Sequence, residues 1–241
     1  RDAQESRGLG DVYKRQILAA YYAKELGVPV HRLICASNSN KVLYDFFRTG
    51  EYDRNREFVL TTSPSMDILI SSNLERLIYH IAGDSAEADA GFMKKLSEEG
   101  KYQITDEMRK RLGDFAGGYA DEEETAEEIR ERYEKDGYVI DPHTAVASAV
   151  YGKYRKETGD ATRTVIVSTA SPFKFETSVM KALGKPHELP DLELADALSA
   201  VSGTPVPQAV AGLRGAEIRH KTVCDKDEKA MAAEVEKFLG I

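Results

Sequence analysis

The sequence predicts an α/β fold with a parallel-sheet core and helices on both faces. Short apolar runs such as RLICA (32–36) and TVIVST (164–169) alternate with segments whose apolar residues recur at helical spacing. Continuous apolar runs are typical of parallel strands buried on both faces, and their alternation with helices is typical of an α/β domain. The chain has 241 residues, of which 41% are hydrophobic, which is enough for a sizeable core.

The helices are predicted from periodicity and from their stop signals. Apolar residues between 17 and 26 lie on one helical face, and Gly27 then ends that helix. Asp141 is a natural N-cap, and Pro142 suits the first helical position of a helix that continues to about Tyr154. Further helices are expected at residues 42–49, 73–81, 174–183, 191–202, 206–213 and 226–239, and charged helix at 84–136. Further strands are expected at residues 67–70 and 217–224.

Charge and cysteine content limit the possible partners. The net charge of −8 and the pI near 5.3 argue against a nucleic-acid partner, and the sequence has no apolar run long enough to span a membrane. Segment 121–134 is acidic first and basic later, which indicates a solvated helix face rather than a cation-binding tail. Cys35 and Cys224 lie in apolar runs, so buried thiols and a reducing cytoplasm are expected.

The first sixteen residues do not suit the helix that follows them. Lys14 and Arg15 place two cations at its N-terminus, where they oppose the helix dipole. Residues 11–16, DVYKRQ, are what GATGTGTATAAGAGACAG encodes, a string that resembles the transposon end used in sequencing libraries. We therefore expect residues 1–16 to be a foreign, disordered segment, with a natural disordered tail as the alternative.

Polar side chains follow two of the predicted strands. SNSN (37–40) follows RLICA, and STASP (168–172) follows the apolar part of TVIVST. Ligands of open α/β sheets bind beyond the carboxyl ends of the strands, so these hydroxyl and amide groups are candidates for binding a ring nitrogen, a carboxylate or a phosphate. Turn and N-cap chemistry is the alternative explanation for both segments.

Common catalytic motifs are absent from the sequence. It contains no GxSxG, no GxGxxG and no P-loop, and its five histidines have no metal-ligand spacing. His143 follows a helix start and could face a site or form a structural hydrogen bond. Ser168, His143 and Asp141 could be drawn as a hydrolase triad, but they do not occur in a known order.

Four ordered blocks together resemble threonine synthase of the longer bacterial and fungal type. They are ILAAYYAKELGVPVHRLICASNSNKVLYDFFRTGEYDRNREF, SPSMDILISSNLERL, GYVIDPHTAVA and STASPFKF, and the resemblance extends from Ile17 to the C-terminus. It implies a pyridoxal 5′-phosphate (PLP) enzyme of the tryptophan-synthase-β group, fold type II. Such an enzyme converts O-phospho-L-homoserine and water to L-threonine and phosphate. Residues 17–241 would then be the C-terminal portion of the catalytic domain.

The resemblance also implies which residues form the site. Thr169 matches the position whose hydroxyl faces the pyridine nitrogen of the cofactor, and Asn38, Asn40 and His143 match positions expected near the substrate. The family's Schiff-base lysine, in a Ser-Phe-Lys-Asp context, and its Gly-Asn-Phe-Gly phosphate turn have no counterpart here. We therefore expect no catalytic residue, no metal site and no activity of this chain alone.

Two alternatives stay open. One is a related PLP-dependent serine or threonine dehydratase, although the SPSMDI and DPHTAVA blocks resemble threonine synthase more than dehydratases. The other is a non-catalytic half-enzyme. The sequence does not predict the oligomeric state.

Overall fold

The computed structural model describes residues 17–219 and 221–241, so the predicted foreign segment, residues 1–16, lies outside the described residues. The chain divides into two compact units, Arg1–Pro205 and Val206–Ile241. The second unit contains α10 (Gln208–Ala211) and α11 (Glu228–Leu239).

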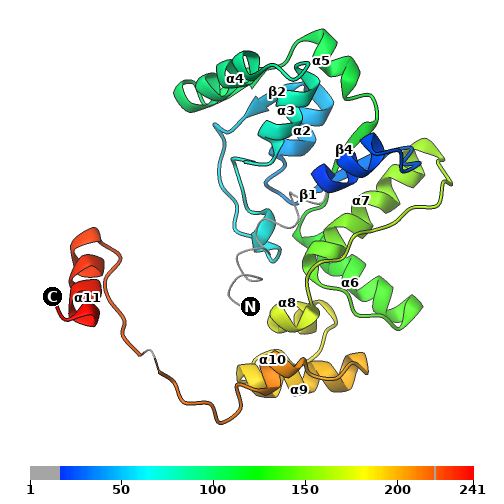
Figure 1. Ribbon diagram of the computed structural model, residues 1–241. Helices are drawn as coiled ribbons and strands as arrows, with labels where there is room; N and C mark the ends of the chain where they lie inside the picture. Colours follow the sequence, from blue (N-terminus) through cyan, green and yellow to red (C-terminus); the bar gives the residue numbers. More distant parts are fainter. Residues whose placement is uncertain (1–16, 220) are drawn as a thin grey trace. The chain divides into compact units, whose positions relative to one another are not determined.

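The first unit combines short strands with many helices (Figure 1). Its first described element is a helix over residues 17–25, close to the predicted 17–26. Its strands are β1 (Leu33–Ser37), β2 (Glu51–Asp53), β3 (Lys101–Gln103) and β4 (Phe115–Tyr119). Its other helices are α2 (Val42–Thr49), α3 (Leu74–Ile81), α4 (Ala86–Glu98), α5 (Asp106–Arg111), α6 (Glu122–Asp136), α7 (Pro142–Thr158), α8 (Glu176–Ala182) and α9 (Asp191–Ser202), with 3-10 turns η1 (Pro64–Met66) and η2 (Pro172–Lys174).

Strands β1 and β4 form a parallel pair that helices cover on both faces, as the sequence predicts. Leu33 pairs with Phe115, and the register continues to the ends of both strands. Neighbouring residues of a strand face opposite sides of the sheet. A Cβ on Gly117 would lie 3.2 Å from the Phe47 Cβ on α2, whereas one on Gly118 would meet α7. Helices α2 and α7 therefore pack on opposite faces of this pair.

The close approach of α7 to β4 gives a first testable prediction. A Cβ on Gly118 would overlap the Val150 Cγ1, so Gly118→Ala should lower the free energy of unfolding by about 2 kcal/mol through overpacking. Gly152→Ala is the control on α7, because a Cβ there has no neighbour within 4 Å and should stabilise the helix by up to about 1 kcal/mol. Urea unfolding compares the two variants, and equal stabilities would contradict the packing described here.

A second, antiparallel pair contributes two buried tyrosines to the hydrophobic core. Tyr52 of β2 stacks on Tyr102 of β3, with ring centroids 5.4 Å apart and an interplanar angle of 7°. The Tyr52 hydroxyl donates to the Leu69 carbonyl at 3.0 Å and accepts from the Ser71 amide at 2.8 Å. Burial raises the pKa of Tyr52 to about 12, so this hydroxyl keeps its proton at neutral pH. The pair therefore anchors the segment that follows η1.

Several predicted strands are wrong, whereas the predicted helices are confirmed outside the 84–136 region. Residues 67–70 form a bend and a loop rather than a strand, since the Ile68 amide turns back to the Met66 carbonyl. Segment 84–136 is interrupted by β3 and β4, which the prediction of continuous charged helix missed.

The two other predicted strands are not formed either. Residues 164–169 and the described part of 217–224 have no strand partner among the described residues. Val165 is 83% exposed and Val223 is 92% exposed, so neither segment is buried as a sheet strand would be. An apolar run predicts a strand only if a neighbouring strand supplies its hydrogen bonds.

The two cysteines differ, which corrects the expectation that both are buried. Cys35 lies in β1 and is buried, and burial raises its pKa to about 12, whereas Cys224 is exposed. Because the thiolate is the reactive form, one thiol per chain should react with an aromatic disulfide reagent at about pH 8, and two should react in urea. Equal rates for both thiols in the native chain would contradict this difference.

Candidate functional site

Four segments meet at the carboxyl end of β1. They are the strand end with Asn38 and Asn40, the loop over residues 59–67, the N-terminus of α7, and the chain at Ser168. Their contacts are polar and largely buried, so the structure brings together three of the predicted site residues and places Thr169 next to their network.

Asn38 holds the loop against the end of β1. The residue is 1% exposed, and its Nδ2 lies 2.7 Å from the Asp67 Oδ1, 2.8 Å from the Thr61 Oγ1 and 3.0 Å from the Ser63 Oγ. Its Oδ1 accepts from the Asn40 amide at 3.0 Å. Both hydrogens of the Asn38 Nδ2 can therefore bond to oxygen atoms of the loop. Protein groups thus satisfy the hydrogen-bonding capacity of this side-chain amide.

Asn40 fixes the start of the same loop. Its Nδ2 donates to the Val59 carbonyl at 2.7 Å, and its Oδ1 accepts from the Val59 amide at 2.9 Å. The Asn40 side chain and the Val59 backbone thus exchange two hydrogen bonds, as two paired residues of a β-sheet do. The Nδ2 also lies 3.0 Å from the Asp67 Oδ1, so Asp67 receives hydrogen bonds from both predicted asparagines.

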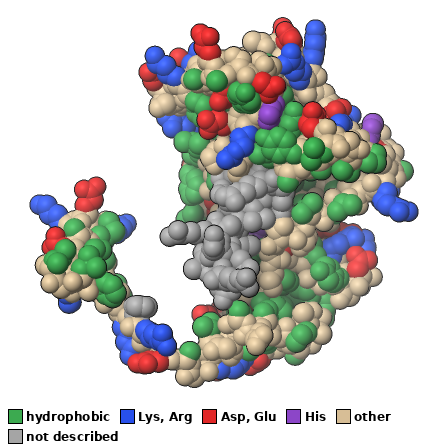
Figure 2. All heavy atoms as spheres, in the orientation of Figure 1, with side chains coloured by type: hydrophobic (Ala, Val, Ile, Leu, Met, Phe, Trp, Pro, Cys, Tyr) green, Lys and Arg blue, Asp and Glu red, His purple; other side chains and the backbone are tan. Residues whose placement is uncertain are grey.

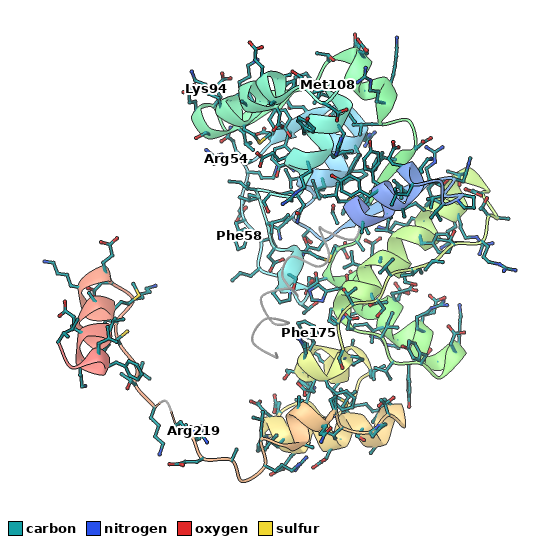
Figure 3. All side chains as sticks on the ribbon, in the orientation of Figure 1. Arg54, Phe58, Lys94, Met108, Phe175 and Arg219 are labelled. Atoms are coloured by element: carbon teal, nitrogen blue, oxygen red, sulfur yellow. The ribbon has the colours of Figure 1, made fainter. Side chains whose placement is uncertain are left out.

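His143 connects the loop to α7. The Ser65 amide donates to its Nε2 at 3.2 Å, which requires that nitrogen to be unprotonated, and its Nδ1 lies 3.2 Å from the Asp141 Oδ1. Nδ1 is therefore the donor, and the Asp141 carboxylate fixes the tautomer. The ring of Phe175 (Figure 3) packs on the imidazole with centroids 4.8 Å apart.

Asp141 caps α7, as predicted, and has a wider role than a cap. Its Oδ1 accepts from the His143 amide at 2.9 Å and from the Thr144 amide at 3.3 Å. Its Oδ2 accepts from the Thr144 hydroxyl, whose oxygen lies 2.8 Å from the Ser168 Oγ. The buried carboxylate thus connects the loop, the helix and the 168–169 segment through one residue.

The hydrolase triad drawn from the sequence is not formed. The Ser168 hydroxyl pairs with Thr144 rather than with His143, and the His143 Nε2 already accepts from Ser65. A nucleophile needs a general base within hydrogen-bond reach, and here that base is occupied by a backbone amide.

Thr169 stands apart from this network. It is half-buried and follows Ser168 directly, and no side-chain hydrogen bond joins its hydroxyl to another described residue. Among the residues that the structure describes, no group of His, Cys, Asp and Glu could hold a metal ion. The Thr169 hydroxyl is therefore the predicted site group that is available to a ligand.

The prediction missed two acidic residues that organise the site. Asp67 lies within the SPSMDI block and receives both asparagine side chains, and the Thr61 amide donates to it at 2.9 Å. Glu122, in the first turn of α6, accepts from the Thr62 amide at 3.0 Å and from its hydroxyl at 3.2 Å. Asp67 could have been found as a lone carboxylate in an apolar stretch, whereas Glu122 looked like one of many surface acids.

Acidic and basic side chains are interspersed on the face shown in Figure 2. No described helix has the length and apolar character to span a bilayer.

Comparisons with known proteins identify relatives of the chain. Residues 144–235 match the family described as "Threonine synthase, C-terminal". Threonine synthase-like 1 of Macaca fascicularis is 35% identical over 229 residues, which cover 92% of this chain and 30% of that protein. Threonine synthase of Saccharomyces cerevisiae is 36% identical over 182 residues, covering 69% and 35%. The chain thus spans about a third of the length of these curated relatives.

The solved structures that superpose on the chain are also threonine synthases. Yeast threonine synthase superposes with a TM-score of 0.76 at 29% identity, covering 93% of this chain and 45% of that one. The PLP-bound threonine synthase from Brucella melitensis superposes with a TM-score of 0.66 at 33% identity, covering 83% and 43%. The fold prediction is therefore confirmed, and residues 144–235 belong to the threonine synthase C-terminal family, within a chain that is similar to part of these longer threonine synthases.

Proposed function

We propose that the chain contributes to a PLP-dependent threonine synthase, which converts O-phospho-L-homoserine and water to L-threonine and phosphate. The observation that supports this most directly is the half-buried Thr169 hydroxyl, which pairs with no described side chain. It lies beside a saturated polar network in a chain whose relatives include a PLP-bound threonine synthase. The compartment expected for this function is the cytoplasm.

Among the described residues, Thr169 suits the edge of the cofactor that carries the pyridine nitrogen. The Thr169 hydroxyl would donate to the pyridine nitrogen and leave it without a neighbouring charge, unlike an aspartate partner. Its position is held through Ser168, which pairs with Thr144 at the start of α7. When bound, the cofactor supplies the electron sink for negative charge that develops on the substrate's carbon atoms.

Asn38, Asn40 and His143 support substrate binding indirectly in this proposal. Their polar atoms are used by the loop over residues 59–67, so they position the SPSMDI block rather than contact the substrate themselves. A loop held at several points loses little further conformational entropy when substrate binds.

The remaining parts of the site are not supplied by this sequence. It contains neither a Ser-Phe-Lys-Asp lysine context nor a Gly-Asn-Phe-Gly turn. We therefore expect the 241-residue chain, mixed with PLP and O-phospho-L-homoserine, to release no phosphate above background. Turnover by the purified chain alone would contradict this part of the proposal.

A chimera tests the role of Thr169. Residues 17–241 would replace the matching region of yeast threonine synthase, and phosphate release from O-phospho-L-homoserine would be measured for the chimera and its variants. Thr169→Ala should lower kcat/KM at least tenfold, whereas Thr169→Ser keeps the hydroxyl and should lower it less than threefold, since removing a hydrogen bond at a reacting group costs about 1–3 kcal/mol.

Circular dichroism would first establish that both Thr169 variants of the chimera fold. Equal activities of folded Thr169→Ala and Thr169→Ser variants would contradict the assignment of this hydroxyl to the cofactor.

A further inference from the structure

The turn η1 reaches the start of α7 through a histidine. The Ser65 amide donates to the His143 Nε2 at 3.2 Å, and within the described part of the chain no other hydrogen bond joins residues 64–66 to α7. Ser65 is half-buried, so water can reach its amide if this bond opens. The next residue, Met66, is buried in the core cluster that contains Val146 of α7. The position of η1 therefore depends on one polar contact and one apolar contact.

The imidazole of His143 is fixed in a single orientation. Its Nδ1 lies 3.2 Å from the Oδ1 of Asp141, a residue that is 1% exposed, and the ring of Phe175 packs on it with centroids 4.8 Å apart (Figure 3). Rotation of the ring would take Nδ1 away from the carboxylate. The neutral ring therefore presents the lone pair of Nε2 to the Ser65 amide.

A second proton on the ring would change one of its two contacts and keep the other. Protonation turns Nε2 from an acceptor into a donor, so two N–H groups would face each other across the 3.2 Å between Ser65 and His143. The Nδ1–H group would still donate to Asp141, and a hydrogen bond between two charged groups is stronger than a neutral one. Asp141 thus favours the protonated ring, whereas the Ser65 amide favours the neutral ring.

Other charged groups near His143 are bound elsewhere. Strands β1 and β4, which pack on α7, contain no charged residue. The charged residues on the other neighbouring segments are Asp67 in the loop, Glu122 and Glu128 on α6, and Lys174 and Glu176 beside Phe175. None of these side chains hydrogen-bonds to the imidazole among the described contacts, since Asp67 binds Asn38, Glu122 binds Thr62 and Glu128 binds Ser148. Asp141 is therefore the charged group in contact with the ring.

We propose that His143 makes the position of η1 sensitive to pH. When Nε2 gains a proton, the Ser65 amide loses its acceptor and η1 moves away from the start of α7. Asn38 and Asn40 keep the rest of the loop in place, because their amides do not titrate. An imidazole ordinarily gains its second proton between about pH 5 and 8, where carboxylates ordinarily stay ionised. The proposal concerns a contact within the described chain and does not depend on the proposed threonine synthase activity.

Nuclear magnetic resonance of the full 241-residue chain tests the proposal directly. Nitrogen chemical shifts would report protonation of the His143 Nε2 between about pH 8.5 and 5, and hydrogen exchange would give the protection factor of the Ser65 amide over the same range. The protection factor of Ser65 should fall about tenfold or more, with the midpoint at which Nε2 gains its proton. The Thr61 amide donates to the Asp67 carboxylate at 2.9 Å, so its protection factor should change less than about twofold.

Two variants test whether His143 causes the change. In His143→Gln the side-chain carbonyl can accept from Ser65 but cannot gain a proton, so protection of Ser65 should not depend on pH. His31→Gln removes an exposed histidine and should keep the response of the wild-type chain.

The wild-type measurement alone can overturn the proposal, so the test does not require that a variant folds. It is overturned if Nε2 stays unprotonated down to about pH 5, or if Nε2 gains its proton while protection of Ser65 is unchanged. A parallel fall at Thr61 would indicate general unfolding and would overturn it as well. The same pH response in folded His143→Gln would show that another group causes the change.

Discussion

Replacing Asp141 with alanine is expected to lower the free energy of unfolding by about 3 kcal/mol. Asp141 is 1% exposed, and its carboxylate accepts from the His143 and Thr144 amides, from the imidazole and from the Thr144 hydroxyl. Alanine removes the cap of α7 and leaves buried donors without acceptors, so both costs add. The helix should also fray at its first turn, which hydrogen exchange of the Thr144 amide would report.

Asp121 provides the matched control for this variant. It caps α6 through the Glu124 amide, and Glu124 reciprocates through its own carboxylate, but this capping box is exposed to solvent. Water can replace the lost acceptor there, so Asp121→Ala should cost about 1 kcal/mol. Equal losses for the two variants in urea unfolding would show that Asp141 acts only as a cap.

Replacing Asn38 with alanine should lower the free energy of unfolding by about 3 kcal/mol and release the loop over residues 59–67. The amide is the contact through which Asp67, Thr61 and Ser63 meet the end of β1. Without it, the bonds that the Asp67 carboxylate keeps to described residues are those to Asn40 and Thr61. Hydrogen exchange of the Thr61 amide should accelerate by more than the global loss of stability explains.

The control for the asparagine variant is Asn55→Ala. The Asn55 amide also donates one hydrogen bond, to the Glu99 carbonyl at 2.9 Å, but the residue is exposed. Its loss should cost less than about 1 kcal/mol and leave exchange at Thr61 unchanged. If Asn38→Ala changed neither stability nor Thr61 exchange, the loop would have to be held by other contacts.

The helices could be predicted because their signals are local. Periodicity predicted a helix over residues 17–26, which the structure has at 17–25, and the Asp141–Pro142 pair predicted the start of α7. Strand β4 was missed because its sequence, FAGGY, lacks the apolar character of a buried strand. Its glycines suit the packing, since a side chain at Gly118 would collide with α7 and one at Gly117 would crowd α2. Packing between distant segments is not visible in the sequence.

The strands that were predicted but are not formed have a different explanation from the missed strand β4. Residues 164–169 have the composition of a buried strand, but strand formation depends on a neighbour, and no described segment pairs with them. The residues that decide whether a helix forms lie within the helix itself. A strand also needs a neighbouring strand, which can lie elsewhere in the sequence. A run of β-branched residues therefore predicts a capacity to pair rather than a strand.

The candidate site was predicted in part. Asn38 and Asn40 were selected because they follow a strand, and His143 because it follows a cap, and the structure brings the three together through one loop. The acidic residues that receive these contacts were missed. Asp67 lies 29 residues from Asn38 and Glu122 lies 60 residues from Thr62, so these two contacts are revealed only by the folded arrangement.

The most direct test of the central claim is to measure which product the chimera described above releases. Its phosphate release from O-phospho-L-homoserine would be compared with its ammonia release from L-serine and L-threonine. We expect phosphate release with PLP bound and no ammonia above background. Ammonia release in place of phosphate would indicate a dehydratase, and a folded, PLP-loaded chimera that releases neither would indicate a non-catalytic relative; either result would contradict the assignment of threonine synthase function to residues 17–241.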